Sequence, residues 1–221
     1  MIQLFKISKP QVLVDNENKW TKNLMEQIDK EVLYKNVDEK HKNLYRQVDI
    51  KDAVILETNA KCAYCESKIL HINYGDIEHI KPKSKFPESS FNWDNLTLAC
   101  TICNNNKRTY WQEDNSKLLN PYVDDISEHL FAIGSLIVHI NNSSRGEITW
   151  KKLKLNRIEL IEQRSEKILE LQNLISQYNK ESNIAIKEIL RDEITDFVAP
   201  DKEFSFTGIC YLRAYPSIDI Y

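Results

Sequence analysis

Glycine and proline are scarce in this sequence, which has only 4 glycines and 6 prolines among its 221 residues. So few of them exclude a collagen-like or linker-dominated chain and argue against a turn-rich β-sandwich. An excess of charge of one sign is also lacking, because 30 basic residues face 33 acidic ones and the formal net charge is −3. Bulk charge therefore does not indicate nucleic-acid binding, and any basic surface must be local.

Long apolar runs are lacking as well. No segment approaches the roughly 18 uninterrupted apolar residues that a membrane span requires. Residues 1–10 lack the basic region and apolar run of a targeting signal. We therefore expect a soluble, cytoplasmic protein with no membrane partner. Hydrophobic residues still make up 42% of the chain, which is enough for a core.

Apolar residues recur every three or four positions in two long segments, residues 15–60 and 153–198. This spacing lays an apolar stripe along one helix face and predicts helices in both segments. We expect most of the stripe residues to be core. The stripes are Trp20, Leu24, Ile28 and Val32; Leu44, Val48 and Ile55; Ile158, Ile161, Ile168, Leu171, Ile175 and Tyr178; and Ile186, Ile189, Leu190, Ile194 and Phe197.

The patterns predict a mainly α fold of the α+β class in three regions. Residues 1–60 form a helical N-terminal region, 61–112 a small core, and 113–221 a mixed connector with C-terminal helices and an apolar tail. Within the connector, we expect a hairpin of two strands, Leu136–Ile140 and Glu147–Trp150. The tail, residues 204–221, is too apolar for a free chain end, so it packs on its own body or docks into a partner.

Five cysteines are present, and four of them form two pairs with a two-residue gap, Cys62 with Cys65 and Cys100 with Cys103. In a reducing cytoplasm we do not expect disulfides. The gap lets both sulfurs of a tight knuckle face one metal, and two knuckles complete a tetrahedron. The pairs predict a structural zinc ion; the alternative is four unrelated buried cysteines. Cys210 stands alone among apolar residues and is expected to be a small buried hydrophobe.

Between and after the knuckles come Glu78-His79, then Asn95-Leu96, and then Asn104 with Lys107 three residues later. In order and spacing these residues resemble the HNH endonuclease family, in the subgroup whose motif is held together by four zinc-binding cysteines. The resemblance implies a small ββα-metal core embedded between helical segments. It also implies a metal-dependent endonuclease that hydrolyses phosphodiester bonds of nucleic acid, DNA in the first place and RNA such as tRNA as the alternative.

The residue types fit this chemistry. Histidine is the side chain best suited to take a proton from water near neutral pH, and carboxylate and amide oxygens suit a hard divalent cation. The resemblance implies that His79 is the general base and that Asn95 braces the loop that holds it. It implies Glu78 and Asn104 as ligands of a catalytic Mg²⁺ or Mn²⁺. Asp76 could replace Glu78 as the ligand or be a turn residue, and the turn is favoured.

Basic residues gather near the motif although the whole chain is slightly acidic. Within residues 81–112 five basic residues face two acidic ones, a local excess that fits phosphate binding. We expect nucleic-acid contacts from Lys81, Lys83, Lys107 and Arg108. The lysine run around Lys83 could equally be a solvated loop.

The opening residues 1–10, the long helical lead-in and the C-terminal helices resemble the HNH subunit of Septu and retron-type anti-phage defence. This second resemblance implies an effector nuclease of a bacterial defence complex that works beside an ABC-type ATPase subunit. Two alternatives remain: a catalytically inactive zinc-knuckle module that binds nucleic acid, and a structural partner subunit in which zinc serves only folding.

Overall fold

A computed structural model describes residues 1–31, 33–69, 74–213, 215 and 218. Contacts divide the chain into two units. The N-terminal unit comprises Leu4–Ala63 and Lys68–Asp114, and the C-terminal unit comprises Asn115–Tyr221 with Met1–Gln3 and Tyr64–Ser67. Helices dominate the described residues, and the strands form only two small antiparallel pairs, so the prediction of a mainly α, α+β fold is confirmed.

The N-terminal unit begins with α1 (Gln11–Glu31), α2 (Glu39–Lys42) and α3 (Val48–Glu57), which are joined through short 3₁₀ turns at Tyr34–Asn36 and Leu44–Arg46. Leu13 and Leu24 lie three turns apart on one face of α1, and both are fully buried.

The predicted stripe of Leu44, Val48 and Ile55 was wrong, because α3 begins only at Val48. Val48 is 72% exposed, and α3 instead buries Ile50 and Val54. In the stripe predicted for α1, Leu24 is fully buried and Trp20 and Ile28 are half-buried, while Val32 lies outside the described residues.

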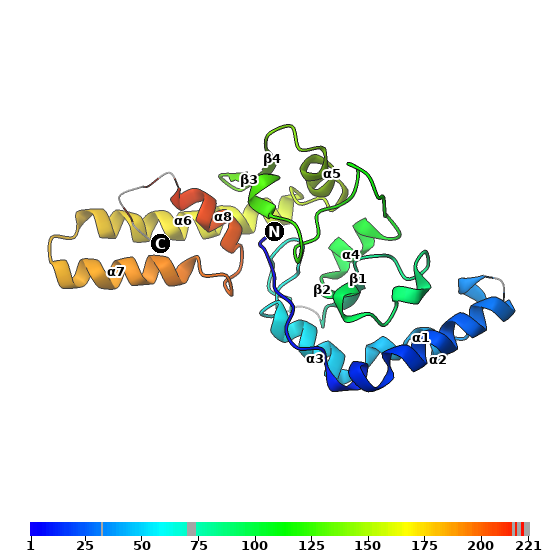
Figure 1. Cartoon of the computed structure of the whole chain (residues 1–221). Coiled ribbons are helices and arrows are strands. Elements are labelled where there is room, and N and C mark those ends of the chain that lie inside the picture. Colours follow the sequence, from blue (N-terminus) through cyan, green and yellow to red (C-terminus); the bar gives the residue numbers. More distant parts are fainter. Residues whose placement is uncertain (32, 70–73, 214, 216–217, 219–221) are drawn as a thin grey trace. The chain divides into compact units, whose positions relative to one another are not determined.

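A small ββα arrangement follows in the same unit (Figure 1). Strand β1 (Asp76–His79) pairs antiparallel with β2 (Leu96–Ala99), and α4 (Thr101–Lys107) follows β2 and contacts β1. The register sets Glu78 opposite Thr97 and His79 opposite Leu96. Two further 3₁₀ turns, Pro87–Ser89 and Trp93–Asn95, shape the loop between the strands.

The C-terminal unit contains a hairpin that differs from the predicted one. Strand β4 (Leu136–His139) pairs with β3 (Leu130–Ile133), which precedes it, through a two-residue turn. Gly134 opens that turn with a φ of +56°, as tight hairpin turns require. The predicted partner strand Glu147–Trp150 was wrong, because these residues belong to helix α5 (Ser144–Lys152).

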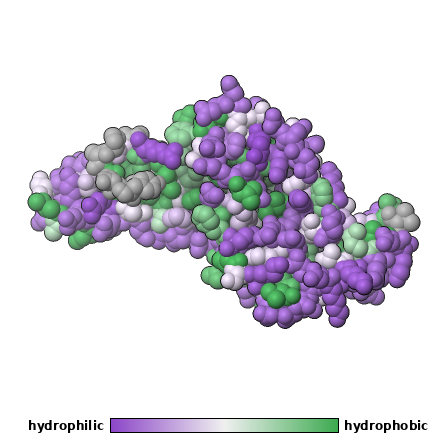
Figure 2. All heavy atoms as spheres, in the orientation of Figure 1, coloured by the Kyte–Doolittle hydropathy of each residue, from purple (hydrophilic) through white to green (hydrophobic). Residues whose placement is uncertain are grey.

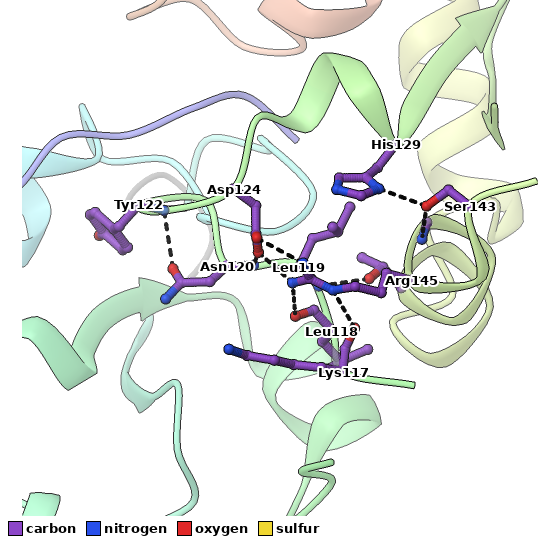
Figure 3. Close-up of polar contacts among 11 residues, drawn as sticks. Lys117, Leu118, Leu119, Asn120, Tyr122, Asp124, His129, Ser143 and Arg145 are labelled. Atoms are coloured by element: carbon purple, nitrogen blue, oxygen red, sulfur yellow. Dashed lines mark hydrogen bonds and ion pairs between the residues drawn. The ribbon is translucent and has the colours of Figure 1, made fainter. Parts of the chain in front are cut away.

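Ser143 explains this difference, because its side chain starts a helix instead of closing a turn. Its Oγ accepts a hydrogen bond from Gly146 N at 3.0 Å, as an N-cap residue does, and lies 2.7 Å from His129 Nδ1 (Figure 3). Arg145 then donates to both carboxylate oxygens of Asp124, at 2.9 and 2.6 Å. These bonds tie the first turn of α5 to the loop before β3.

Two long helices and a short one complete this unit: α6 (Ile158–Lys180), α7 (Ile184–Phe197) and α8 (Ser205–Leu212). Helices α6 and α7 lie side by side, and the face visible in Figure 2 is mostly hydrophilic there. Of the residues predicted as core, four are exposed, because only one stripe of each helix faces inward. The exposed ones are Ile158, Ile186 and Ile189, with Val48 of α3. The buried cluster is Leu171, Ile175, Ile194, Val198, Leu212 and Ile218.

The described part of the apolar tail packs on its own unit. Phe204, Phe206 and Leu212 are at most 8% exposed, and Cys210 is 3% exposed, as expected of a small buried hydrophobe. The remainder of the predicted tail, including Ile220 and Tyr221, lies outside the described residues. Within the part of the chain that the structure describes, no helix is long and apolar enough to cross a membrane.

Gly146→Ala tests the packing of α5. Glycine-to-alanine changes in a helix normally stabilise by about 1 kcal/mol. Here the added Cβ would lie 2.3 Å from the carbonyl oxygen of His129, so the backbone must move. We therefore expect destabilisation, by about 1–3 kcal/mol as for other overpacked sites, measured by thermal melting. Ser144→Ala, at an exposed neighbouring position, should leave the melting temperature nearly unchanged. A stabilised Gly146→Ala variant would contradict the close approach.

Candidate active site

The four paired cysteines converge. Their Sγ atoms all lie within 4.8 Å of one another, and all but Cys100 are buried. Tetrahedral zinc with Zn–S bonds of about 2.3 Å places its sulfurs about 3.8 Å apart, so this donor set fits one zinc ion. Four thiolates would close the coordination shell, which makes the site structural. The alternative of four unrelated cysteines is excluded by this convergence.

Each knuckle is built from a different local structure. Cys62 and Cys65 lie in a turn that follows α3, and Ala63 N donates to Leu98 O of β2 at 2.9 Å, which attaches this turn to the sheet. Cys100 is the N-cap of α4, where its sulfur accepts from Cys103 N at 3.4 Å. The second knuckle is thus the joint between β2 and α4, so a metal there would fix how α4 meets the strands.

Asn95 fastens the loop between the strands. Its Oδ1 accepts from Lys81 N at 2.6 Å, and its Nδ2 donates to Lys81 O at 3.1 Å and to Ser89 O at 3.0 Å. These bonds close both ends of the loop with one buried side chain. The bracing role that the resemblance implied for Asn95 stays a prediction.

His79 points into this braced loop. Its Nε2 lies 2.9 Å from the carbonyl oxygen of Ser90, so Nε2 carries the proton and Nδ1 is the basic nitrogen. The Tyr45 ring packs edge-on against the imidazole at 4.6 Å, and His79 is only 5% exposed. Burial lowers the pKa of His79 to about 3, so the ring is neutral at neutral pH, the form that can accept a proton.

Glu78 faces the opposite way because neighbouring strand residues point to opposite sides. Its Oε1 pairs with Lys107 Nζ of α4 at 2.6 Å, and the same Nζ donates to the carbonyl oxygen of His79 at 2.8 Å. Both side chains are buried, and burial raises the pKa of Glu78 although Lys107 counteracts this. Glu78 and His79 are therefore held apart by separate partners.

Asp76 corrects the sequence interpretation. It begins strand β1 and is not a turn residue. From the same strand face as Glu78, its Oδ2 accepts from Asn104 Nδ2 at 3.0 Å. Asn104 and Lys107 are one helical turn apart on α4, which explains why each meets one carboxylate of β1. Asp76 and Asn104 line a cavity of about 390 Å³, whereas Glu78 and His79 are not among its lining residues.

The basic residues divide between surface and interior. Lys107, predicted as a phosphate contact, is 2% exposed, and its ammonium group pairs with buried Glu78. Lys81 and Arg108 are exposed. Lys83 is half-buried, with its Nζ donating to the Tyr45 hydroxyl at 2.6 Å.

Three residues of the cavity were missed by the sequence interpretation: Tyr45, Arg46 and Lys51. They precede the motif in the sequence, and no spacing links them to it. A basic residue within a predicted helical lead-in gives no signal until the fold brings it to β1.

Cys62→Ser tests the zinc site. A serine hydroxyl is a poor substitute for a thiolate, and the small core depends on the metal, so we expect loss of about one zinc per chain and loss of cooperative unfolding. Zinc is measured by colorimetric release and folding by circular dichroism. Cys210→Ser is the control and should keep its zinc, because Cys210 lies outside the four-sulfur cluster. Full zinc content in Cys62→Ser would contradict the assignment.

Comparisons with known proteins find relatives of this chain. The chain is 32% identical to a Septu protein PtuB of Bacillus mycoides (strain KBAB4) over 151 residues, which cover 55% of this chain and 51% of the relative. It is 27% identical to a Septu protein PtuB of Bacillus thuringiensis over 160 residues, which cover 72% of this chain and 56% of the relative. The chain thus spans about half the length of the curated relatives it matches.

A family model matches a shorter segment. Residues 62–109 match the model of the HNH endonuclease family, from the first zinc-knuckle cysteine to just beyond α4. The matched segment contains both strands, α4 and all four cysteines of the cluster. Residues 62–109 are therefore an HNH endonuclease domain, of a family of hydrolases that act on the phosphodiester bonds of nucleic acid.

Proposed function

We propose that this protein is a metal-dependent endonuclease that hydrolyses phosphodiester bonds of nucleic acid. One observation carries the proposal: the HNH match falls on the ββα arrangement whose two strands and helix bring His79, Asp76 and Asn104 into one unit. The fold alone would not support an activity, because folds host many functions. Support comes from a histidine, a carboxylate and an amide in the matched segment.

His79 acts as the general base in this proposal. The bond from Nε2 to Ser90 O fixes the tautomer, which leaves Nδ1 to accept a proton from the attacking water. A base with a pKa near 3 has little driving force to take a proton from water at neutral pH. A substrate phosphate beside the ring would raise this pKa, because a nearby negative charge favours the imidazolium. Asn95 contributes by holding the loop that carries Ser90.

The proposed divalent cation, Mg²⁺ or Mn²⁺, would bind beside β1 and α4. Asp76 and Asn104 line the cavity with a carboxylate and a side-chain amide, whose oxygens are the donor type that hard cations prefer, and the amide nitrogen of Asn104 donates to Asp76. We assign them as the ligands in preference to Glu78, which is 6% exposed and paired with Lys107. When bound, the cation would neutralise charge that develops on the phosphate and the leaving oxygen. Glu78 then neutralises the buried charge of Lys107.

The biological setting is proposed from the relatives. Both are named Septu protein PtuB, and similarity covers up to 72% of this chain, which supports an effector nuclease of a Septu anti-phage defence complex. An ABC-type ATPase subunit is the proposed partner, with DNA as the first candidate substrate and RNA as the second. Incubation with labelled DNA and total RNA plus Mg²⁺, with and without the neighbouring gene product, separates these cases on one gel.

A second candidate is a zinc-stapled module that binds nucleic acid without cutting it. The observation that favours it is the burial of His79, which Tyr45 covers and Ser90 engages. Such a module needs phosphate contacts and no base. Binding without product in the gel assay, with Mg²⁺ or Mn²⁺ present, would favour this candidate over the nuclease.

His79→Ala tests the nuclease directly. Removal of a general base should lower the cleavage rate by about 10²–10⁴-fold, because no other group takes its place next to Ser90. Initial rates on labelled substrate measure this, with zinc content and melting as folding controls. His41→Ala, outside the motif, is the matched control and should cleave at the wild-type rate. Equal rates for His79→Ala and wild type would refute the assignment.

Asp76→Asn and Glu78→Gln together test the cation ligands. Asp76→Asn removes a charged oxygen ligand, so we expect the Mg²⁺ concentration for half-maximal cleavage to rise at least tenfold. Glu78→Gln should change this requirement less, because Glu78 pairs with Lys107. Both are measured by titrating Mg²⁺ into the cleavage assay. If Glu78→Gln raised the requirement and Asp76→Asn did not, Glu78 would be the ligand.

A further inference from the structure

The cavity next to Asp76 and Asn104 has a wall that the HNH segment does not supply. Its lining residues are Gly75, Asp76 and Ile77 from the start of β1, Asn104 from α4, and Tyr45, Arg46 and Lys51 from the end of the helical lead-in. The last three precede the residues 62–109 that match the family model. Two of them are cations, so the cavity sets positive charge opposite a single carboxylate, that of Asp76.

The guanidinium of Arg46 lies against Tyr45, with its central carbon 5.7 Å from the centre of the Tyr45 ring. Its Nε donates to the Tyr45 hydroxyl at 3.3 Å, and Tyr45 itself is 4% exposed and packed against His79. The residue as a whole is exposed. Among the described residues, its two terminal nitrogens have no hydrogen-bond partner. The planar guanidinium thus presents its outer edge, the part that pairs with two phosphate oxygens at once.

Lys51 has a different role in the cavity. Its Nζ donates to the carbonyl oxygen of Gly75 at 2.7 Å, directly before Asp76. Gly75 has a φ of +64°, and a Cβ there would lie 3.0 Å from Leu98 Cδ1, so this turn into β1 is tight. Lys51 therefore holds the turn that presents Asp76, while its charge faces the same carboxylate.

We propose that Arg46 contacts the substrate, binding a backbone phosphate of the nucleic acid in this cavity beside Asp76 and Asn104, with Lys51 as a positioning residue. The inference rests on the proposed function, because it places the phosphate beside the proposed cation ligands. Guanidinium–phosphate contacts fix the position of a strand without reading its bases. Arg46 therefore brings the scissile region to the site irrespective of sequence.

The test measures binding apart from cleavage. Fluorescein-labelled single-stranded DNA, duplex DNA and single-stranded RNA of mixed sequence are titrated with the full chain without added Mg²⁺, over a series of salt concentrations. Loss of one phosphate contact should lower the slope of log affinity against log salt by about 1. We expect this for Arg46→Ala. Arg46→Lys should keep the slope, because the charge remains, but bind more weakly because the two-point contact is lost.

Arg191→Ala is the matched control, since Arg191 is partly exposed on α7 and its described partner is its neighbour Asp192. It should keep the wild-type affinity and slope. Melting temperature and zinc content of Arg46→Ala should equal those of the wild type, because the guanidinium is not part of the core. Under cleavage conditions Arg46→Ala should raise KM more than it lowers kcat.

The outcomes separate this inference from the proposed function. If the wild type cleaves and Arg46→Ala keeps the wild-type slope and KM, Arg46 is not the phosphate contact and the nuclease assignment stands. If the wild type binds without cleaving and Arg46→Ala lowers the slope, the phosphate site stands and hydrolysis does not. If the wild type neither binds nor cleaves any of the three probes, the phosphate site and the nuclease assignment are both refuted. A loss confined to one base sequence would overturn backbone recognition.

Discussion

The convergence of four sulfurs at one point is the constraint on which the ββα arrangement depends. The ββα arrangement has two strands of four residues and a helix of seven, too little to bury a stable core alone. The second knuckle lies at the joint of β2 and α4, with Cys100 as helix cap and Cys103 in the first turn. Since Asn104 follows Cys103 directly, a metal that fixes the cysteine also fixes the rotation of α4 that turns Asn104 toward β1.

The interface between β1 and α4 is polar. Neighbouring residues of β1 therefore have different polar partners and different roles. Asp76 and Glu78 share one strand face and meet Asn104 and Lys107, whereas His79 meets the loop on the other side. A buried ion pair such as Glu78–Lys107 is costly to desolvate and costlier to break, because either partner alone would be an unpaired buried charge. The pair therefore adds little net stability but strongly specifies how the helix lies on the strand.

The sequence predicts a structural feature correctly where the spacing of its residues is compatible with only one geometry. Two-residue gaps between cysteines predicted the metal cluster, and the resemblance to the HNH family, carried by His79, Asn95 and Asn104, implied the ββα arrangement. Failures occurred where a pattern has two meanings. The residues before α5 look like a hairpin turn, but Ser143 caps a helix, and the hairpin forms earlier at Gly134. From the sequence alone, Lys107 is expected to be a surface cation. Its ion pair with Glu78 of β1 joins residues that are far apart in the sequence, so it was not predicted.

The helical lead-in is part of the same physical unit as the HNH segment. Lys6 Nζ donates to Glu57 of α3 and to the carbonyl oxygen of Leu96 on β2, and Trp93 Nε1 donates to Ile7 O at 3.0 Å. The bonds to Leu96 and Trp93 join residues that precede the family match to β2 and to the 3₁₀ turn that leads into it. The same lead-in supplies Tyr45, which covers the imidazole, and Arg46, which borders the cavity. A minimal fragment cut at residues 62–109 would thus lose the wall facing Asp76 and the bonds that hold β2. In the proposed reaction, the cation ligands come from the matched segment, and the substrate contact comes from the helices that precede it.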